Sequence, residues 1–235
     1  MSVQPVMQNV SINDGRKRCS FSVENERVGR VDVNVREYNL EQDRFRTEVF
    51  DSNKQLLGYD VFDMPKADSM FEYEIKVFPP YRGNGLGELM RLTSVAQMVE
   101  NNVDEMNLFS KPTAIYFHAK HGFEPNIKSF DQRRSSLEAV VANKMVEGDV
   151  FVPKAEKILK AVESPLSLTF EENQKYTMQT NELVKDFIKK VLATGAQNDA
   201  KFSFGFNMKL MRDTIFERAE FFNQLFEKRG IKFKI

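Results

Sequence analysis

The pair Pro79-Pro80 divides the sequence into two parts with different hydrophobic patterns. Before it, apolar residues alternate with polar ones in short runs separated by turn residues, which predicts the strands of a half-buried antiparallel sheet. After it, apolar residues mostly recur at helical spacing. The prolines themselves end the last predicted strand, because proline cannot donate a hydrogen bond to a strand ladder. The chain is therefore expected to combine an antiparallel sheet with helices.

The boundaries of these elements follow from the same two periodicities. The predicted strands before the prolines are residues 18–23, 31–38, 44–50, 56–62 and 71–77. The predicted helices after them are residues 88–101, 113–121, 132–146, 154–162, 179–193 and 207–228. Segments with strand-like composition lie between these helices, at 105–109, 166–170 and 201–206, and after the last of them, at 231–235.

Charge and cysteine content exclude several classes of function. The 235 residues contain 34 Lys and Arg and 34 Asp and Glu, so the net charge gives no reason to expect nucleic acid or an anionic membrane as the main partner. The single cysteine, Cys19, can form neither an internal disulfide nor a thiolate metal site. There is no apolar run of membrane-spanning length and no signal-peptide pattern. A cytoplasmic protein is expected.

The segment with the clearest chemical meaning is residues 75–87, IKVFPPYRGNGLG, where a predicted strand is followed by a glycine-rich loop and a helix. The loop consists of Arg82, Gly83, Asn84, Gly85, Leu86 and Gly87. Glycines allow the backbone to approach a ligand closely, and the start of a helix attracts anions, most often phosphate. The spacing fits neither a Walker loop nor the dinucleotide-binding fingerprint.

Two motifs in the expected order resemble those of the GNAT acyltransferase superfamily. The first has the form Val-x-Pro-x-x-Arg/Gln-x-x-Gly-x-Gly/Ala, which is matched here by Val77, Pro79, Arg82, Gly85 and Gly87. The second has the form Ala-x-x-Phe-Tyr-x-x-x-Gly-Phe, which is matched in part by Ala114, Phe117, Gly122 and Phe123. The resemblance covers roughly residues 19–126 and does not extend to the C-terminal part.

This resemblance implies a site for acetyl-CoA, or for a longer acyl-CoA, as co-substrate, and no metal. The backbone N–H groups of residues 82–87 would hold the CoA pyrophosphate. The strand end formed by Lys76, Val77 and Phe78 would bind the pantetheine arm. The N–H of Val77 would polarise the thioester carbonyl, which is the role of an oxyanion hole.

The resemblance leaves the proton-transfer residues open. The family tyrosine that protonates the departing thiolate is replaced by His118, and Tyr116 is a poor substitute because it points elsewhere on the predicted helix. Glu72 and Glu74 lie on the strand before the loop and are candidates for the general base. The alternative for His118 is a partly exposed helix residue with no role, and the alternative for Glu72 and Glu74 is a solvated or salt-bridged strand face. His121 near the end of its helix suits a dipole-stabilising role, and a metal site on the two histidines would need a third ligand.

The predicted fold is α/β (α+β): a GNAT-like mixed, mainly antiparallel sheet flanked by helices, with a mainly helical C-terminal extension. The predicted division is an acyl-CoA-binding core at 1–130 and an extension at 131–235. Residues 201–206 are expected to supply the sheet's last strand, with 166–170 as the alternative. Exposed strand edges and a phenylalanine-rich surface make a homodimer plausible.

The favoured function is N-acyltransfer, in which a primary amine of a small molecule or a protein attacks acetyl-CoA directly. The lack of a Ser–His–Asp or Cys–His arrangement agrees with a mechanism without a covalent enzyme intermediate. One alternative is a non-catalytic acyl-CoA-binding sensor or interaction module. Another is a structural protein in which residues 82–87 form only a turn, and this alternative predicts no affinity for CoA.

Overall fold

The computed structural model of the chain describes residues 10–13, 16–39, 44–66, 68–143, 150–163 and 168–235. The chain forms two compact units. The first consists of residues 1–107 together with 211–235, and the second of residues 108–210. Each unit is described separately below.

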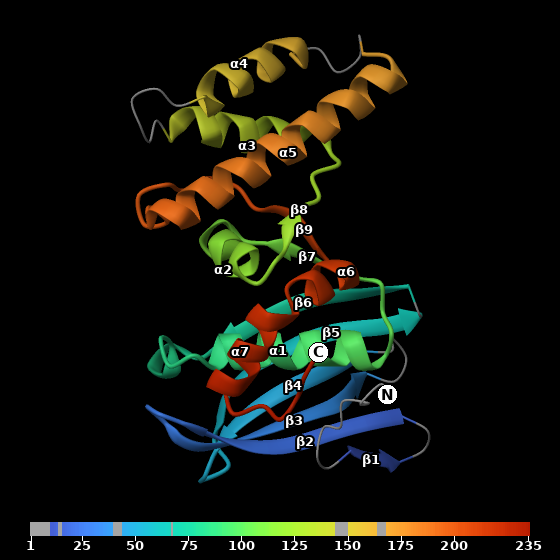
Figure 1. The fold of residues 1–235 in the computed structure, drawn as a ribbon, viewed down its shortest axis with the longest axis vertical. Helices are drawn as coiled ribbons and strands as arrows, with labels where there is room; N and C mark the ends of the chain where they lie inside the picture. Colours follow the sequence, from blue (N-terminus) through green and yellow to red (C-terminus); the bar gives the residue numbers. More distant parts are fainter. Residues whose placement is uncertain (1–9, 14–15, 40–43, 67, 144–149, 164–167) are drawn as a thin grey trace. The chain divides into compact units, whose positions relative to one another are not determined.

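The first unit contains six consecutive antiparallel strands, which lie side by side in Figure 1. They are β1 (Val10–Asn13), β2 (Arg16–Asn25), β3 (Gly29–Asn39), β4 (Arg44–Asp51), β5 (Leu56–Lys66) and β6 (Ser69–Val77). A further strand, β7 (Glu105–Ser110), begins in the first unit and ends in the second. The mainly antiparallel sheet expected from the alternating pattern is confirmed.

One face of this sheet is apolar and is covered by a helix. Val31, Val33 and Val49 are fully buried, as period-two alternation predicts. Helix α1 (Leu86–Glu100) contacts β4, β5 and β6 across this face. The C-terminal helices α6 (Arg212–Glu217) and α7 (Ala219–Lys228) belong to the same unit, and α7 contacts α1. The end of the chain is thus part of the unit that contains the glycine-rich loop.

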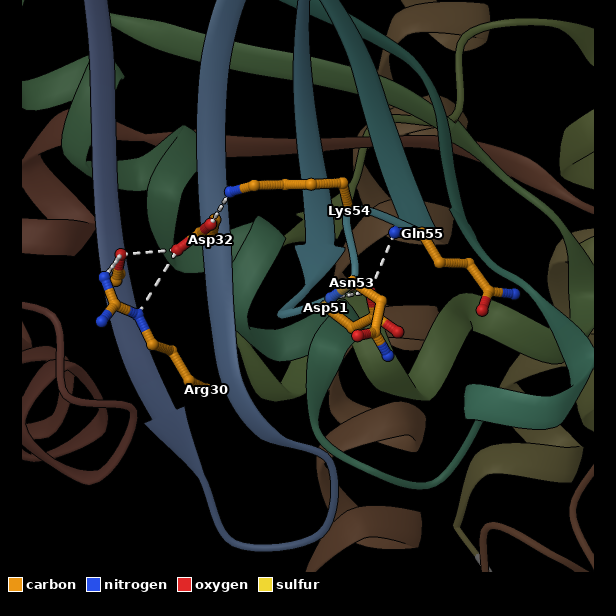
Figure 2. A network of polar contacts seen from close by, with 7 residues as sticks. Arg30, Asp32, Asp51, Asn53, Lys54 and Gln55 are labelled. Atoms are coloured by element: carbon orange, nitrogen blue, oxygen red, sulfur yellow. Dashed lines mark hydrogen bonds and ion pairs between the residues drawn. The ribbon is translucent and has the colours of Figure 1, made fainter.

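Polar contacts fix the turns at one end of the sheet (Figure 2). Asp51 Oδ1 accepts hydrogen bonds from the backbone N–H of Asn53 (2.9 Å) and of Gln55 (2.8 Å), which closes the predicted turn between β4 and β5. On β3, Asp32 accepts a hydrogen bond of 2.6 Å from the Lys54 ammonium. This contact and a second one from Ser22 lower the pKa of Asp32.

Strand β6 departs from the expected alternation because of a β-bulge. Val61 pairs with Glu74 but Phe62 pairs with Glu72, so that Tyr73 is an extra residue in the ladder. Glu72 is buried as a result, whereas Phe71 and Tyr73 are 37% and 46% exposed. Strict alternation over 71–77 predicts that Phe71 and Tyr73 lie on the apolar face and that both glutamates lie on the opposite one, and this prediction is therefore wrong.

The second unit is mainly helical. Its helices are α2 (Ile115–Lys120), α3 (Phe130–Ala142), α4 (Phe151–Ala161) and α5 (Phe170–Thr194). Helices α3, α4 and α5 contact one another, and α5 begins at a capping box in which Thr169 and Glu172 bond each other's backbone N–H groups. No helix in the described ranges is both long enough and apolar enough to cross a bilayer.

The last strand lies later in the chain than expected. Strand β9 (Phe206–Met211) pairs antiparallel with the short β8 (Glu124–Pro125). It replaces the first turns of the helix predicted at 207–228 and the strand predicted at 201–206. Its burial alternates along Phe206, Met208 and Leu210, whereas the apolar residues of the same stretch also fit a helical stripe. The alternative strand at 166–170 lies partly outside the described residues, and its end belongs to α5.

Candidate functional site

At the end of β6, the backbone N–H of Val77 points away from the neighbouring strand β5. The N–H of Phe78 donates to the carbonyl of Leu57 at 3.0 Å. Adjacent residues of an antiparallel strand direct their N–H groups to opposite edges, so the N–H of Val77 points away from β5. The carbonyl of Val77 points the same way and accepts a hydrogen bond of 3.1 Å from Arg82 Nε. The side chain of Arg82 thus fixes the strand end that leads into the loop.

The glycine-rich loop forms a cradle of unpaired backbone donors. After a single 3-10 turn, η2 (Pro79–Tyr81), Gly83 and Gly85 adopt positive φ angles of 79° and 77°. Gly85 is the N-cap of α1, and its carbonyl accepts the bond from Leu89 N–H at 3.0 Å. The N–H groups of Asn84, Gly85, Leu86 and Gly87 make no hydrogen bond to any described residue.

Two side chains, one at the end of β2 and one in the turn that follows it, donate hydrogen bonds to carbonyl groups of this loop. Asn25 Nδ2 donates to the carbonyl of Asn84 at 2.8 Å, and Arg27 Nη1 donates to the carbonyl of Gly83 at 3.2 Å. These contacts join positions that lie 59 and 56 residues apart in the sequence. Side chains at the end of β2 and in the following turn therefore support the loop.

The C-terminal segment supplies a third support. Two nitrogens of Arg229 contact the same carboxylate oxygen, Oε1 of Glu88, in the first turn of α1. Nε donates a hydrogen bond to it at 2.7 Å, and Nη2 lies 2.6 Å from it. Its guanidinium occupies the space that a Cβ atom at Gly85 would need. The left-handed backbone therefore favours glycine at position 85, and any larger side chain there would also displace the Arg229 guanidinium.

A buried cluster of charged groups lies under α1 beside the site. Glu72 forms a two-pronged ion pair with Arg91, in which Nη2 and Oε1 are 2.6 Å apart and Nη1 also contacts Oε2. Asp60 is fully buried and lies 2.5 Å from the Ser94 hydroxyl. Burial, and then repulsion by Glu72, raise the pKa of Asp60 well above its usual range. Glu72 thus has a structural partner, and its side chain is closed to solvent.

Glu74 differs from Glu72 in its surroundings. It lies on the exposed side of the bulge and accepts a hydrogen bond of 2.8 Å from the Tyr59 hydroxyl. Lys76 lies nearby with its ammonium 5.8 Å from the ring centres of both Tyr59 and Phe78. Of the two glutamates singled out from the sequence, only Glu74 is open to solvent.

The two histidines lie in the second unit and are both buried. His118, in α2, packs its ring edge-on against Phe117 and Phe123, at centroid distances of 5.3 and 5.7 Å. His121, the C-cap of that helix, has Nδ1 at 2.8 Å from the carbonyl of Phe117. His118 is therefore a core residue of its unit, in contrast to the partly exposed position expected for a side chain without a role.

Tyr116 points in another direction from the same helix. Its ring packs against Phe202, and its buried hydroxyl has no hydrogen-bond partner among the described residues. Burial raises the pKa of Tyr116 to about 12, so the phenol holds its proton at neutral pH. No group of three or more His, Cys, Asp or Glu residues suited to a metal ion occurs within the described part of the chain.

Comparison with known proteins finds similarity only at the level of structure. No family model matches the sequence, and no curated protein matches it either. Many of the solved structures that it resembles are GNAT acetyltransferases, and they match about 40% of the chain. Three of them are a GNAT family acetyltransferase from Elizabethkingia anophelis with acetyl-CoA bound, the PaiA N-acetyltransferase from Thermoplasma acidophilum in complex with coenzyme A, and the spermidine/spermine N-acetyltransferase SpeG from Vibrio cholerae.

These similarities are partial. The identities are 14%, 16% and 18%, and the TM-score is 0.34 in each case. The matches cover 37%, 37% and 39% of this chain and 60%, 56% and 58% of the three known chains. The matched region therefore spans less than two thirds of each of these acetyltransferases.

Proposed function

We propose that the protein is an N-acyltransferase that uses acetyl-CoA, or a longer acyl-CoA, to acylate a primary amine. The observation that carries this proposal is the cradle at residues 84–87, whose four N–H groups are unpaired among the described residues and lie at the start of α1. Such a cradle fits a diphosphate, because it offers several donors and the positive end of a helix dipole. The two GNAT-like sequence motifs narrow the ligand to CoA.

In the proposed reaction, the amine nitrogen forms a bond to the thioester carbonyl carbon and the carbon–sulfur bond breaks. The N–H of Val77 stabilises the negative charge that develops on the carbonyl oxygen. Glu74 accepts the proton that the amine loses, directly or through water, because it is the exposed carboxylate on this strand. On the family resemblance alone, we assign the return of a proton to the CoA sulfur to His118, with Tyr116 as the alternative donor.

The first test is thermal unfolding in the presence of acetyl-CoA, longer acyl-CoAs, free CoA or ATP. A ligand that binds only the folded protein raises the unfolding midpoint once its concentration exceeds its Kd. We expect CoA compounds to raise it and ATP to have little effect. Gly85→Ala should abolish the shift, because it places a methyl group against Arg229 and strains the cradle.

The matched control is Gly195→Ala. Gly195 has a similar φ of 70° with open space around it, so this variant carries the same backbone strain outside the loop. If CoA shifts the unfolding midpoint of the two variants equally, the cradle does not bind CoA. If no CoA compound shifts the midpoint of the unaltered protein, the proposal is wrong. If the protein binds CoA but acylates no amine in a panel of polyamines, aminoglycosides and peptides, the alternative function of a non-catalytic acyl-CoA sensor is favoured.

A second test separates the two glutamates. Glu74→Gln should lower kcat for acylation, with little change in CoA binding. Glu72→Gln should act mainly through stability, because Glu72 is the buried partner of Arg91. The reverse pattern would identify Glu72 as the base.

A further inference from the structure

The turn between β2 and β3 contacts the glycine-rich loop through one side chain whose orientation is fixed. Asn25 Oδ1 accepts hydrogen bonds from the backbone N–H groups of Arg27 (3.0 Å) and Val28 (3.2 Å). An amide oxygen that accepts from two N–H groups leaves its nitrogen as the only possible donor on the other side. The Nδ2 of Asn25 therefore donates to the carbonyl of Asn84, at 2.8 Å.

This contact determines where the loop donors point. The C=O of one residue and the N–H of the next are antiparallel across a trans peptide bond. The carbonyl of Asn84 points at Asn25, so the N–H of Gly85 points away from the turn. The carbonyl of Gly83 points at Arg27 in the same way, so the N–H of Asn84 also points away from it. Two consecutive donors thus face the same side before any ligand is bound.

We propose that Asn25 is a positioning residue that presents the N–H groups of Asn84 and Gly85 to the diphosphate of CoA. This inference rests on the proposed function, since it concerns the same site. Glycines at 83 and 85 make the loop easy to deform, and a free loop would have to be ordered each time it binds. The side-chain contact from Asn25 removes this cost, because the loop peptides are already oriented.

The test compares ligands with and without the diphosphate. Asn25→Ser retains a hydroxyl acceptor for the turn but is too short to reach Asn84, and Asn25→Asp retains the acceptor but cannot donate. We expect either variant to weaken CoA binding by about tenfold, the upper range for one hydrogen bond. Binding of S-acetyl-pantetheine, which has no diphosphate, should stay within about twofold. The matched control is Asn53→Ser, which makes the same exchange in the exposed turn between β4 and β5.

The readouts are titration calorimetry on the intact chain and steady-state kinetics. We expect a rise in KM for acetyl-CoA with kcat unchanged. If the unaltered protein binds CoA and Asn25→Ser binds it equally well, the inference is wrong and the proposed function stands. Equal losses for CoA and S-acetyl-pantetheine would show a general structural role and would also overturn it. If the unaltered protein does not bind CoA at all, the proposed function fails first and the inference fails with it.

Discussion

The buried carboxyl group of Asp60 makes the stability of the first unit depend on pH. Asp60 lies between β5 and α1, with no exposed surface, and its Oδ1 atom has no hydrogen-bond partner among the described residues. Burial and the neighbouring Glu72 raise its pKa, and Arg91 and Ser94 only partly offset these effects. The folded protein therefore keeps a proton on Asp60 at pH values where the unfolded chain has lost it.

The size and sign of the effect follow from this difference in bound protons. Between the unfolded pKa, about 3.9, and the higher folded pKa, the folded state holds one more proton at Asp60 than the unfolded state. The free energy of unfolding therefore falls by about 1.4 kcal/mol for each unit of rising pH in this window. Asp60→Asn removes the titrating group and resembles the protonated form, so it should abolish this slope.

The assay is urea unfolding of both proteins from pH 5 to pH 8, with the free energies compared at each pH. We expect the stability of Asp60→Asn relative to the unaltered protein to rise with pH until the folded pKa of Asp60 is reached. Asp32→Asn is the matched control. The pKa of Asp32 is lowered by Lys54 and Ser22, so Asp32 is ionised in both states throughout this range and its replacement should leave the slope unchanged. Parallel pH profiles for the unaltered protein and Asp60→Asn would refute the reasoning.

Three further predictions concern packing within the two units, and each is measured by urea unfolding. Gly85→Ala should destabilise the protein by about 1 kcal/mol more than Gly195→Ala does, because only the former displaces a guanidinium as well as straining the backbone. Arg91→Met should cost about 3–5 kcal/mol by leaving Glu72 unpaired in the interior, and adding Glu72→Leu should restore most of the loss. Tyr116→Phe should leave stability unchanged or raise it by up to about 1 kcal/mol, because the buried hydroxyl lacks a partner in the described structure.

The strands before Pro79 could be predicted because their pattern is local and simple. Residues such as Val31, Val33 and Val35 alternate strictly with polar neighbours, and the structure buries all three. The stretch 207–228 could not be assigned correctly, because its apolar residues satisfy both periods in the first turn. The pairing of β9 with β8 settles the choice there, and that pairing joins segments more than 80 residues apart.

The glycine-rich loop could also be predicted from the sequence, because its residues are consecutive in the chain. The predicted glycine-rich loop leads into a helix as expected, and Gly83 and Gly85 adopt positive φ angles within it. The side chains that support the loop could not be predicted from the sequence. Asn25 and Arg229 are an ordinary turn asparagine and an ordinary charged residue near a helix end, and no spacing rule links either of them to the loop.

The bulge at Tyr73 gives the two glutamates on either side of it different surroundings. With strict alternation Glu72 and Glu74 would share a face of β6, and both would be equal candidates for proton transfer. The extra residue turns Glu72 inward, where Arg91 neutralises its charge, and leaves Glu74 beside the Tyr59 hydroxyl on the exposed face. A buried arginine on α1 needs an acidic partner, because an unpaired charge in the core is costly. The bulge therefore pairs one glutamate with the buried arginine and leaves the other open to solvent, as the role proposed for Glu74 requires.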